Sequence, residues 1–135
     1  MEISKISYLG ELRTEARHLK SGETFITDAP LDNQGKGEAF SPTDLLATSL
    51  GACMVTIMGI AARTHGIPIG KIEISVSKFM ASNPRRVEKI GLILEIEDRG
   101  YTDHQKNLLE TAGRNCPVAK SLHPDLVQEV QFIYQ

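Results

Sequence analysis

An uncharged stretch in the first half of the chain constrains its fold more than any other feature. Leu45–Ala62 carries no charged side chain over 18 residues, which is close to the length of a membrane-spanning helix. Small and polar side chains interrupt this stretch and leave it only modestly apolar: Thr48, Ser49, Gly51, Thr56 and Gly59. We therefore interpret the stretch as the core helix of a soluble protein, and we expect no membrane contact.

The residues around this stretch predict where the helix begins and ends. Ser41 can cap free backbone N–H groups, Pro42 suits the first helical position, and Asp44 occupies the place of the acid in a capping box. The helix should end at residue 63 or 64, with Gly66 near its C-cap. Because the helix is apolar almost all round and the chain is short, we expect a second copy to help bury it, in a homodimer.

Length and composition favour one globular domain over residues 1–135 and exclude several functions. Hydrophobic residues make up 41% of the chain and charged residues 24%, as in soluble globular proteins. The formal net charge of −2 leaves no basic surface for a phosphate backbone, and aromatic residues amount to only 5%, so we expect no nucleic-acid binding. The first five residues, Met1 to Lys5, lack the apolar core of a signal peptide, which predicts a cytoplasmic protein.

The order of the expected strands and helices along the chain predicts an α+β fold, because the strands come in groups and do not alternate strictly with helices. A loop rich in Pro, Asp, Asn and Gly is expected over 28–37. Thr102 and Gln105 form a capping-box signature for a helix to about Ala112, which Gly113 can end. The other expected elements are strands over 2–9, 12–19, 24–27, 72–77, 87–96 and 127–134, and a short helix over 117–122.

The two cysteines, Cys53 and Cys116, are the candidate reactive groups. They are too few for a disulfide framework, and they form no zinc motif with each other or with the four histidines, so no metal site is expected. Cys53 lies among small residues inside the long helix, where it could also serve only to pack. Cys116 precedes Pro117 at a helix N-terminus, where free N–H groups favour a thiolate; on this physics alone Cys116 is the more acidic thiol.

The segments around both cysteines carry a family resemblance. Residues 41–54 read Ser-Pro-Thr-Asp-Leu-Leu-Ala-Thr-Ser-Leu-Gly-Ala-Cys-Met, and residues 116–122 read Cys-Pro-Val-Ala-Lys-Ser-Leu. In this order, and with shorter matches at 12–15, 21–22 and 27–30, they resemble the two cysteine motifs of the OsmC/Ohr family, in its OsmC-like branch. The resemblance covers nearly the whole chain.

This resemblance implies an OsmC/Ohr-like fold, with a long central helix packed by antiparallel sheets in an intertwined homodimer whose active sites lie at the subunit interface. It also implies a thiol-dependent peroxidase that reduces organic hydroperoxides. By the motifs, Cys53 attacks the peroxide and Cys116 resolves the resulting sulfenic acid as a disulfide, which reverses the order that the helix end suggests. An external dithiol, of the lipoyl type in the family, would reduce the enzyme, and no bound cofactor is required.

The family also uses an arginine and a carboxylate near the attacking thiol, since only the thiolate is an effective nucleophile. Arg13 is our candidate for the cation, with Arg17 as the fallback. Peroxide-reducing members usually carry Glu directly after the proline that opens the helix, where this chain has Thr43. Asp44 or Glu38 could supply the carboxylate instead. This departure keeps open an alternative function, an OsmC-like small-molecule binding or redox-sensing domain with little peroxidase activity.

Overall fold

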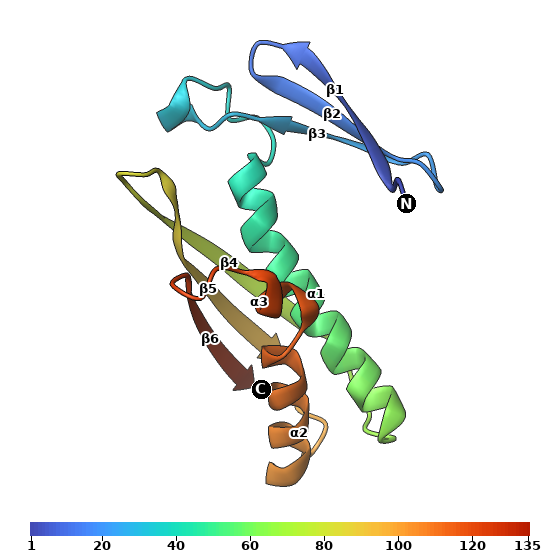
Figure 1. Cartoon of the computed structure of the whole chain (residues 1–135). Helices are drawn as coiled ribbons and strands as arrows, with labels where there is room; N and C mark the ends of the chain where they lie inside the picture. The colour runs from blue at the N-terminus through green and yellow to red at the C-terminus, as the bar shows by residue number, and fades with distance from the viewer. The chain divides into compact units, whose positions relative to one another are not determined.

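A computed structural model describes all 135 residues, which divide into two compact units, Met1–Leu46 and Ala47–Gln135. The first unit is built on a three-stranded antiparallel sheet in the order β1-β2-β3 (Figure 1). A short 3-10 helix, η1, follows within the loop that the sequence predicts. The bounds are β1 (Ser4–Gly10), β2 (Arg13–His18), β3 (Thr24–Asp28) and η1 (Leu31–Asn33).

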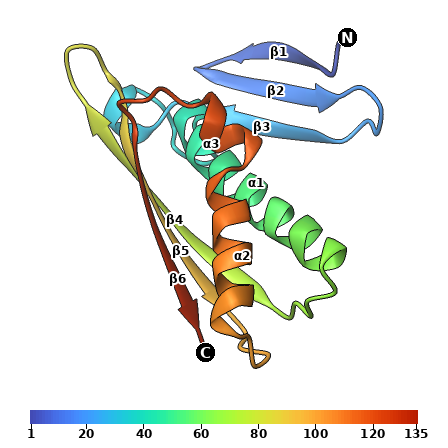
Figure 2. The same cartoon turned by 60° about the horizontal axis from the view of Figure 1, so that its bottom comes forward.

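The second unit contains a second three-stranded sheet, in the order β4-β5-β6, and most of the long helix α1, which begins in the first unit. The helices of this unit cover one face of the sheet, as both views show (Figures 1 and 2). The bounds are α1 (Pro42–Thr64), β4 (Ile72–Ala81), β5 (Arg86–Ile96), α2 (Asp103–Arg114), α3 (Pro117–Ser121) and β6 (Val127–Tyr134). The α+β fold class and the predicted helix starts are confirmed.

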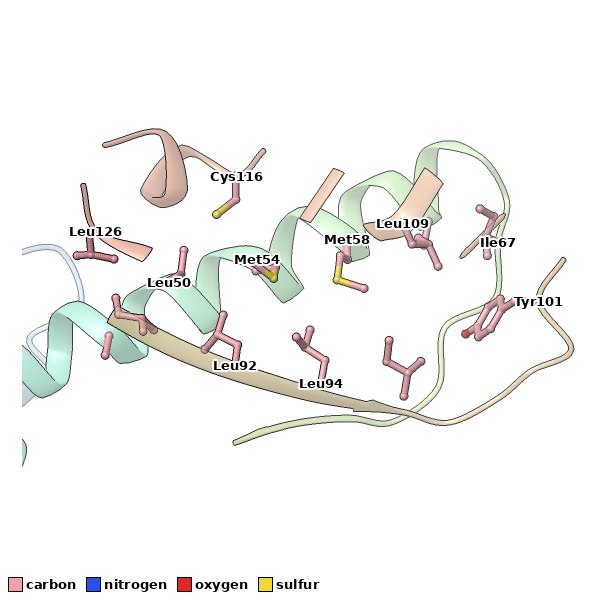
Figure 3. Packing of buried hydrophobic residues seen from close by; sticks show 14 of the residues in the cluster. Leu50, Met54, Met58, Ile67, Leu92, Leu94, Tyr101, Leu109, Cys116 and Leu126 are labelled. Carbon is pink, nitrogen blue, oxygen red and sulfur yellow. The ribbon is translucent and has the colours of Figure 1, made fainter. Parts of the chain in front are cut away.

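The core of the second unit forms where α1 packs on its sheet. By length and composition α1 could cross a membrane, but Leu50, Met54 and Met58 are fully buried, and they belong to the cluster of apolar side chains that Figure 3 shows. On the strand side Leu92 and Leu94 of β5 are buried as well. Burial of each such side chain contributes about 1.5–3 kcal/mol. This packing supports the interpretation of α1 as a core helix.

The strand pairing differs in one respect from the expected antiparallel sheets. β4 pairs with β5 in antiparallel register, but β6 pairs with β5 in parallel, from Lys89 opposite Val127 to Ile96 opposite Tyr134. The chain leaves β5 at one end of the sheet and returns to the other end through α2 and α3. Such a crossover connection is what a parallel pair requires. The expected antiparallel arrangement is therefore wrong for β5 and β6. It is confirmed for the pairs β1–β2, β2–β3 and β4–β5.

Gly113 does not end α2, contrary to the sequence-based expectation. The helix continues to Arg114, and the C-cap is Asn115. Gly113 is buried instead, and a Cβ atom built there would lie 2.9 Å from the Cγ atoms of both Met54 and Met58. The glycine is therefore needed for space, because it lets α2 approach α1 closely.

The sheet of the first unit has very little core of its own. Within this unit the buried residues are Ala16, Thr27, Asp28 and Ser41, of which only one is apolar. Ile6 and Phe25 flank Ala16 in register across the three strands, yet they are 69% and 51% exposed. A sheet with an open apolar face lacks the burial that normally stabilises it.

Candidate functional site

The predicted site residues form two groups, one in each unit. The second unit contains both thiols, Cys53 and Cys116. The first unit contains Arg13 with two carboxylates, those of Asp28 and Glu38. Arg13 and Glu38 were expected from the sequence.

The two thiols lie side by side and differ in accessibility. Cys53, in the middle of α1, is half-buried and packs against the core of the second unit. Cys116 is the N-cap of α3 and fully buried, with its sulfur pointing toward α1 (Figure 3). The side chains of Cys53 and Cys116 are close enough to form a hydrogen bond. Both are free thiols, so a dithiol pair is assembled from helices far apart in the sequence.

Burial raises the pKa of the Cys116 thiol above its usual range. The backbone N–H of Ala119 donates to the Cys116 sulfur at 3.4 Å and lowers this pKa, while the neighbouring Cys53 thiol raises it. The pKa of Cys116 therefore shifts in the direction opposite to the one that the helix end predicts. α3 has only five residues, and the loss of solvation at a fully buried sulfur outweighs its N-terminal N–H groups.

In the first unit, Arg13 and Asp28 form a two-point ion pair across adjacent strands. The Arg13 Nε donates to one oxygen of Asp28 at 2.6 Å, and a terminal nitrogen of the same guanidinium donates to the other at 2.8 Å. That terminal nitrogen also donates to the carboxylate of Glu38 at 3.0 Å. The side chain of Arg13 is 26% exposed and that of Glu38 is 66% exposed, whereas that of Asp28 is only 1% exposed.

The contacts around Arg13 and Asp28 favour the ionised form of both side chains. The Arg13 guanidinium holds the pKa of Asp28 below its usual range, with help from the Glu38 backbone N–H, which donates at 3.1 Å, and from the charge of Lys36. In turn Asp28 raises the pKa of Arg13, so the guanidinium stays charged. Asp28 was not among the site residues expected from the sequence, which predicts a loop beginning at this residue, whereas the structure places it at the end of β3. Its register opposite Arg13 depends on how β2 and β3 pair, which the sequence does not specify.

The other candidates of the first unit have local roles. The backbone N–H of Ser41 donates to the Asp44 carboxylate at 2.9 Å, and the Asp44 N–H donates to the Ser41 hydroxyl at 3.1 Å. This is a reciprocal cap at the start of α1. The Thr43 hydroxyl lies 3.2 Å from the Ser41 hydroxyl. Arg17 is exposed on β2, in register with Lys5 and Thr24. In this unit the carboxylates that contact Arg13 are therefore those of Asp28 and Glu38.

Comparison with known proteins identifies the family. The profile of the family described as OsmC-like protein matches residues 35–130. A crystal structure from Psychrobacter arcticus, described as an osmotic stress induced and detoxification response protein, is 50% identical with a TM-score of 0.92, and the match covers 98% of this chain and 96% of that one. The chain therefore belongs to the OsmC-like family. A search among curated proteins gave no match.

More distant structures share the fold. The organic hydroperoxide resistance protein OsmC of Legionella pneumophila is 17% identical with a TM-score of 0.71, and the match covers 100% of this chain and 96% of that one. The organic hydroperoxide resistance protein OhrB of Bacillus subtilis is 18% identical with a TM-score of 0.66, covering 98% and 97%. At these identities the likeness concerns the fold alone.

Proposed function

We propose that this protein is a cysteine-based peroxidase that reduces organic hydroperoxides with Cys53 and Cys116. The observation that carries the proposal is the pair of adjacent free thiols, one half-buried and the other fully buried. An accessible sulfur that attacks and a protected sulfur that resolves are what a two-cysteine peroxide reaction needs. The names of relatives with this fold, organic hydroperoxide resistance proteins, support the substrate class.

The proposed reaction begins at Cys53. Its thiolate attacks the terminal peroxide oxygen, the O–O bond breaks, and the alkoxide takes a proton and leaves as an alcohol, so that Cys53 becomes a sulfenic acid. The Cys116 sulfur then attacks the Cys53 sulfur. A disulfide forms, and the hydroxyl leaves as water with the proton of the Cys116 thiol. An external dithiol, of the lipoyl type in chemical class, reduces the disulfide by thiol–disulfide exchange.

Arg13 is the cation that we assign to the Cys53 thiolate in this proposal. Its guanidinium is permanently charged and oriented by two carboxylates. A fixed cation lowers the pKa of a thiol and raises the fraction that can attack at neutral pH.

We also propose that the protein acts as a homodimer in the cytoplasm. Apolar side chains are exposed in each unit, among them Tyr8 at 67% and Ile60 at 55%. Exposed apolar surface of this kind is typical of a face that another protein covers. A second copy of the chain is the simplest occupant, since soluble oligomers are most often symmetric dimers.

The test separates the roles of the two thiols. Wild-type protein with a dithiol should consume cumene hydroperoxide faster than hydrogen peroxide, and one equivalent should lower its intact mass by about two hydrogens per chain. Cys53→Ser should abolish turnover. Cys116→Ser should react once and stop as a sulfenic acid that dimedone traps on Cys53. A dimedone adduct on Cys116 in the Cys53→Ser variant would overturn the assignment of the attacking thiol.

The same assay addresses the alternative function. Thr43 in place of the glutamate that the resemblance leads us to expect is the observation in its favour. If wild-type protein binds an apolar ligand but consumes no organic peroxide with a dithiol present, the protein is a binding or redox-sensing domain and the proposed peroxidase activity is wrong.

A further inference from the structure

Gln128 is a polar side chain on the core-facing side of β6. Successive side chains of a strand alternate between the two faces of a sheet, so Gln128 shares its face with Val130 and Phe132, which pack against the core. It is half-buried and lies opposite the fully buried Ile90 of β5. Burial of an amide is unfavourable unless it finds a hydrogen-bond partner. The reaction described so far gives Gln128 no role.

The partner of the Gln128 amide lies in α3. The Nε2 atom of Gln128 donates to the Ala119 carbonyl at 3.1 Å, in partly buried surroundings. The backbone N–H of Ala119 in turn donates to the Cys116 sulfur at 3.4 Å. The two polar groups of the Ala119 backbone therefore connect the side chain of Gln128 to the buried thiol of the same unit.

The helix that carries these contacts is too short to hold its geometry alone. α3 has five residues, none of them fully buried, and an isolated helix of this length is not stable in water. The Ser121 hydroxyl donates to the Pro117 carbonyl at 2.8 Å, but this bond joins two residues of α3 itself. The bond from Gln128 instead ties α3 to a strand of the sheet. We therefore expect the contact between Ala119 and the Cys116 sulfur to depend on support from β6.

The position of the Cys116 sulfur matters most for closure of a disulfide. This sulfur points toward α1 (Figure 3), and the side chains of Cys116 and Cys53 are close enough to form a hydrogen bond. The rate of an intramolecular step depends steeply on the alignment of the reacting atoms, and a small displacement can slow it severely. A fixed α3 therefore favours attack by Cys116 on the Cys53 sulfur, whereas the earlier attack by Cys53 on a substrate does not require it.

We propose that Gln128 is a positioning residue for the resolving thiol: its amide, through the Ala119 carbonyl, holds α3 so that the Cys116 sulfur faces Cys53. The inference rests on the proposed function, because it concerns the step in which Cys116 closes the disulfide. In that step the Cys116 sulfur attacks the Cys53 sulfur, the S–S bond forms, and the hydroxyl of the sulfenic acid leaves as water with the proton of the Cys116 thiol. Gln128 acts on this step through α3.

The experiment measures closure of the disulfide without any peroxide. The aromatic disulfide DTNB should react first with the more accessible Cys53, which forms a mixed disulfide and releases one thionitrobenzoate. Cys116 then attacks the Cys53 sulfur of this mixed disulfide and releases the second thionitrobenzoate; Cys116→Ser should release only the first. Gln128→Met should slow the second phase about fivefold, the effect of one lost hydrogen bond, and leave the first phase within about twofold of wild type.

Gln128→His tests the donated hydrogen bond directly. A neutral imidazole N–H has nearly the reach of the glutamine amide, so this variant should recover most of the second-phase rate at about pH 8. Gln131→Met is the matched control, because Gln131 lies on the exposed face of the same strand. It should leave both phases unchanged. If circular dichroism shows that Gln128→Met does not fold, Gln128→Glu takes its place, since it keeps the shape and loses the donor.

Four results would overturn the inference. They are an unchanged second phase in a folded variant that lacks the donor, equal slowing in Gln131→Met, no recovery in Gln128→His, and rapid alkylation of Cys116 in Gln128→Met, which would show that α3 has unfolded. Failure of the proposed peroxidase activity would appear separately, as wild-type protein that shows both phases with DTNB but consumes no organic peroxide.

Discussion

Replacement of Gly113 by alanine tests whether close packing of α2 on α1 supports both the fold and the thiol pair. The new methyl group would lie 2.9 Å from the Cγ atoms of Met54 and Met58 and 3.1 Å from the Met58 sulfur. Neither methionine can move into solvent, since both are fully buried. Overpacking of this kind lowers the free energy of unfolding by about 1–3 kcal/mol. Alanine has the higher helix propensity and raises the same free energy by about 1 kcal/mol relative to glycine. The net loss of unfolding free energy should be about 1 kcal/mol.

Gly59→Ala is the matched control for this variant. Gly59 also lies inside a helix, α1, but no atom lies within 4 Å of a Cβ atom built there. Gly59→Ala should raise the free energy of unfolding by about 1 kcal/mol, from helix propensity alone. The helix-propensity contribution cancels when the unfolding free energies of the two alanine variants are subtracted. The remaining difference should equal the packing cost of Gly113→Ala, about 1–3 kcal/mol. Urea unfolding of both variants at one protein concentration measures it.

Gly113→Ala should also disturb the pair of thiols. The Cys116 N–H donates to the Gly113 carbonyl at 3.2 Å, so a shift of this turn of α2 moves Cys116 with it. Disulfide formation between Cys53 and Cys116 after one equivalent of organic peroxide should therefore be slower in Gly113→Ala than in Gly59→Ala. Equal urea midpoints for the two variants would refute the packing argument, and equal disulfide rates would refute its link to the thiols.

Three further predictions concern the thiols and the assembly. In native, reduced protein, iodoacetamide should modify Cys53 at least about tenfold faster than the fully buried Cys116, as peptide mass spectrometry would record; equal rates would contradict the burial. Because burial raises the pKa of Cys116, the folded state keeps a proton that the unfolded state loses. The contribution of Cys116 to stability should thus be constant below about pH 8 and fall above it, and Cys116→Ser should lack this part of the decline in urea midpoint. Light scattering should report twice the chain mass of 14.9 kDa, and a stable monomer at micromolar concentration would argue against the homodimer.

Elements with local signals could be predicted from the sequence. Thr102 and Gln105 form the reciprocal cap of α2 that their spacing predicts. Pro42 opens α1, and Cys116 immediately precedes α3. Such caps depend on side chains within one turn of the helix end, so a single sequence contains nearly all the information.

Features that depend on distant parts of the chain could not be predicted in this way. The parallel pairing of β6 depends on the path through α2 and α3, and the packing role of Gly113 depends on which residues of α1 face it. The sequence suggested Arg13 and Glu38 but not Asp28, whose position opposite Arg13 follows from strand register. The acidity of Cys116 was predicted with the wrong sign, because a helix end is visible in a sequence and burial of the sulfur is not.

The separation of the two cysteines along the chain gives the proposed reaction cycle a thermodynamic consequence. A disulfide between Cys53 and Cys116 would close a loop of about 60 residues that contains β4, β5 and α2. By loop-closure entropy, a cross-link of this length destabilises the unfolded chain by about 4 kcal/mol. The oxidised form would then resist unfolding more strongly than the reduced form. Each turnover would thus alternate the second unit between a less stable and a more stable state, so that exposure to peroxide would itself protect the chain against unfolding.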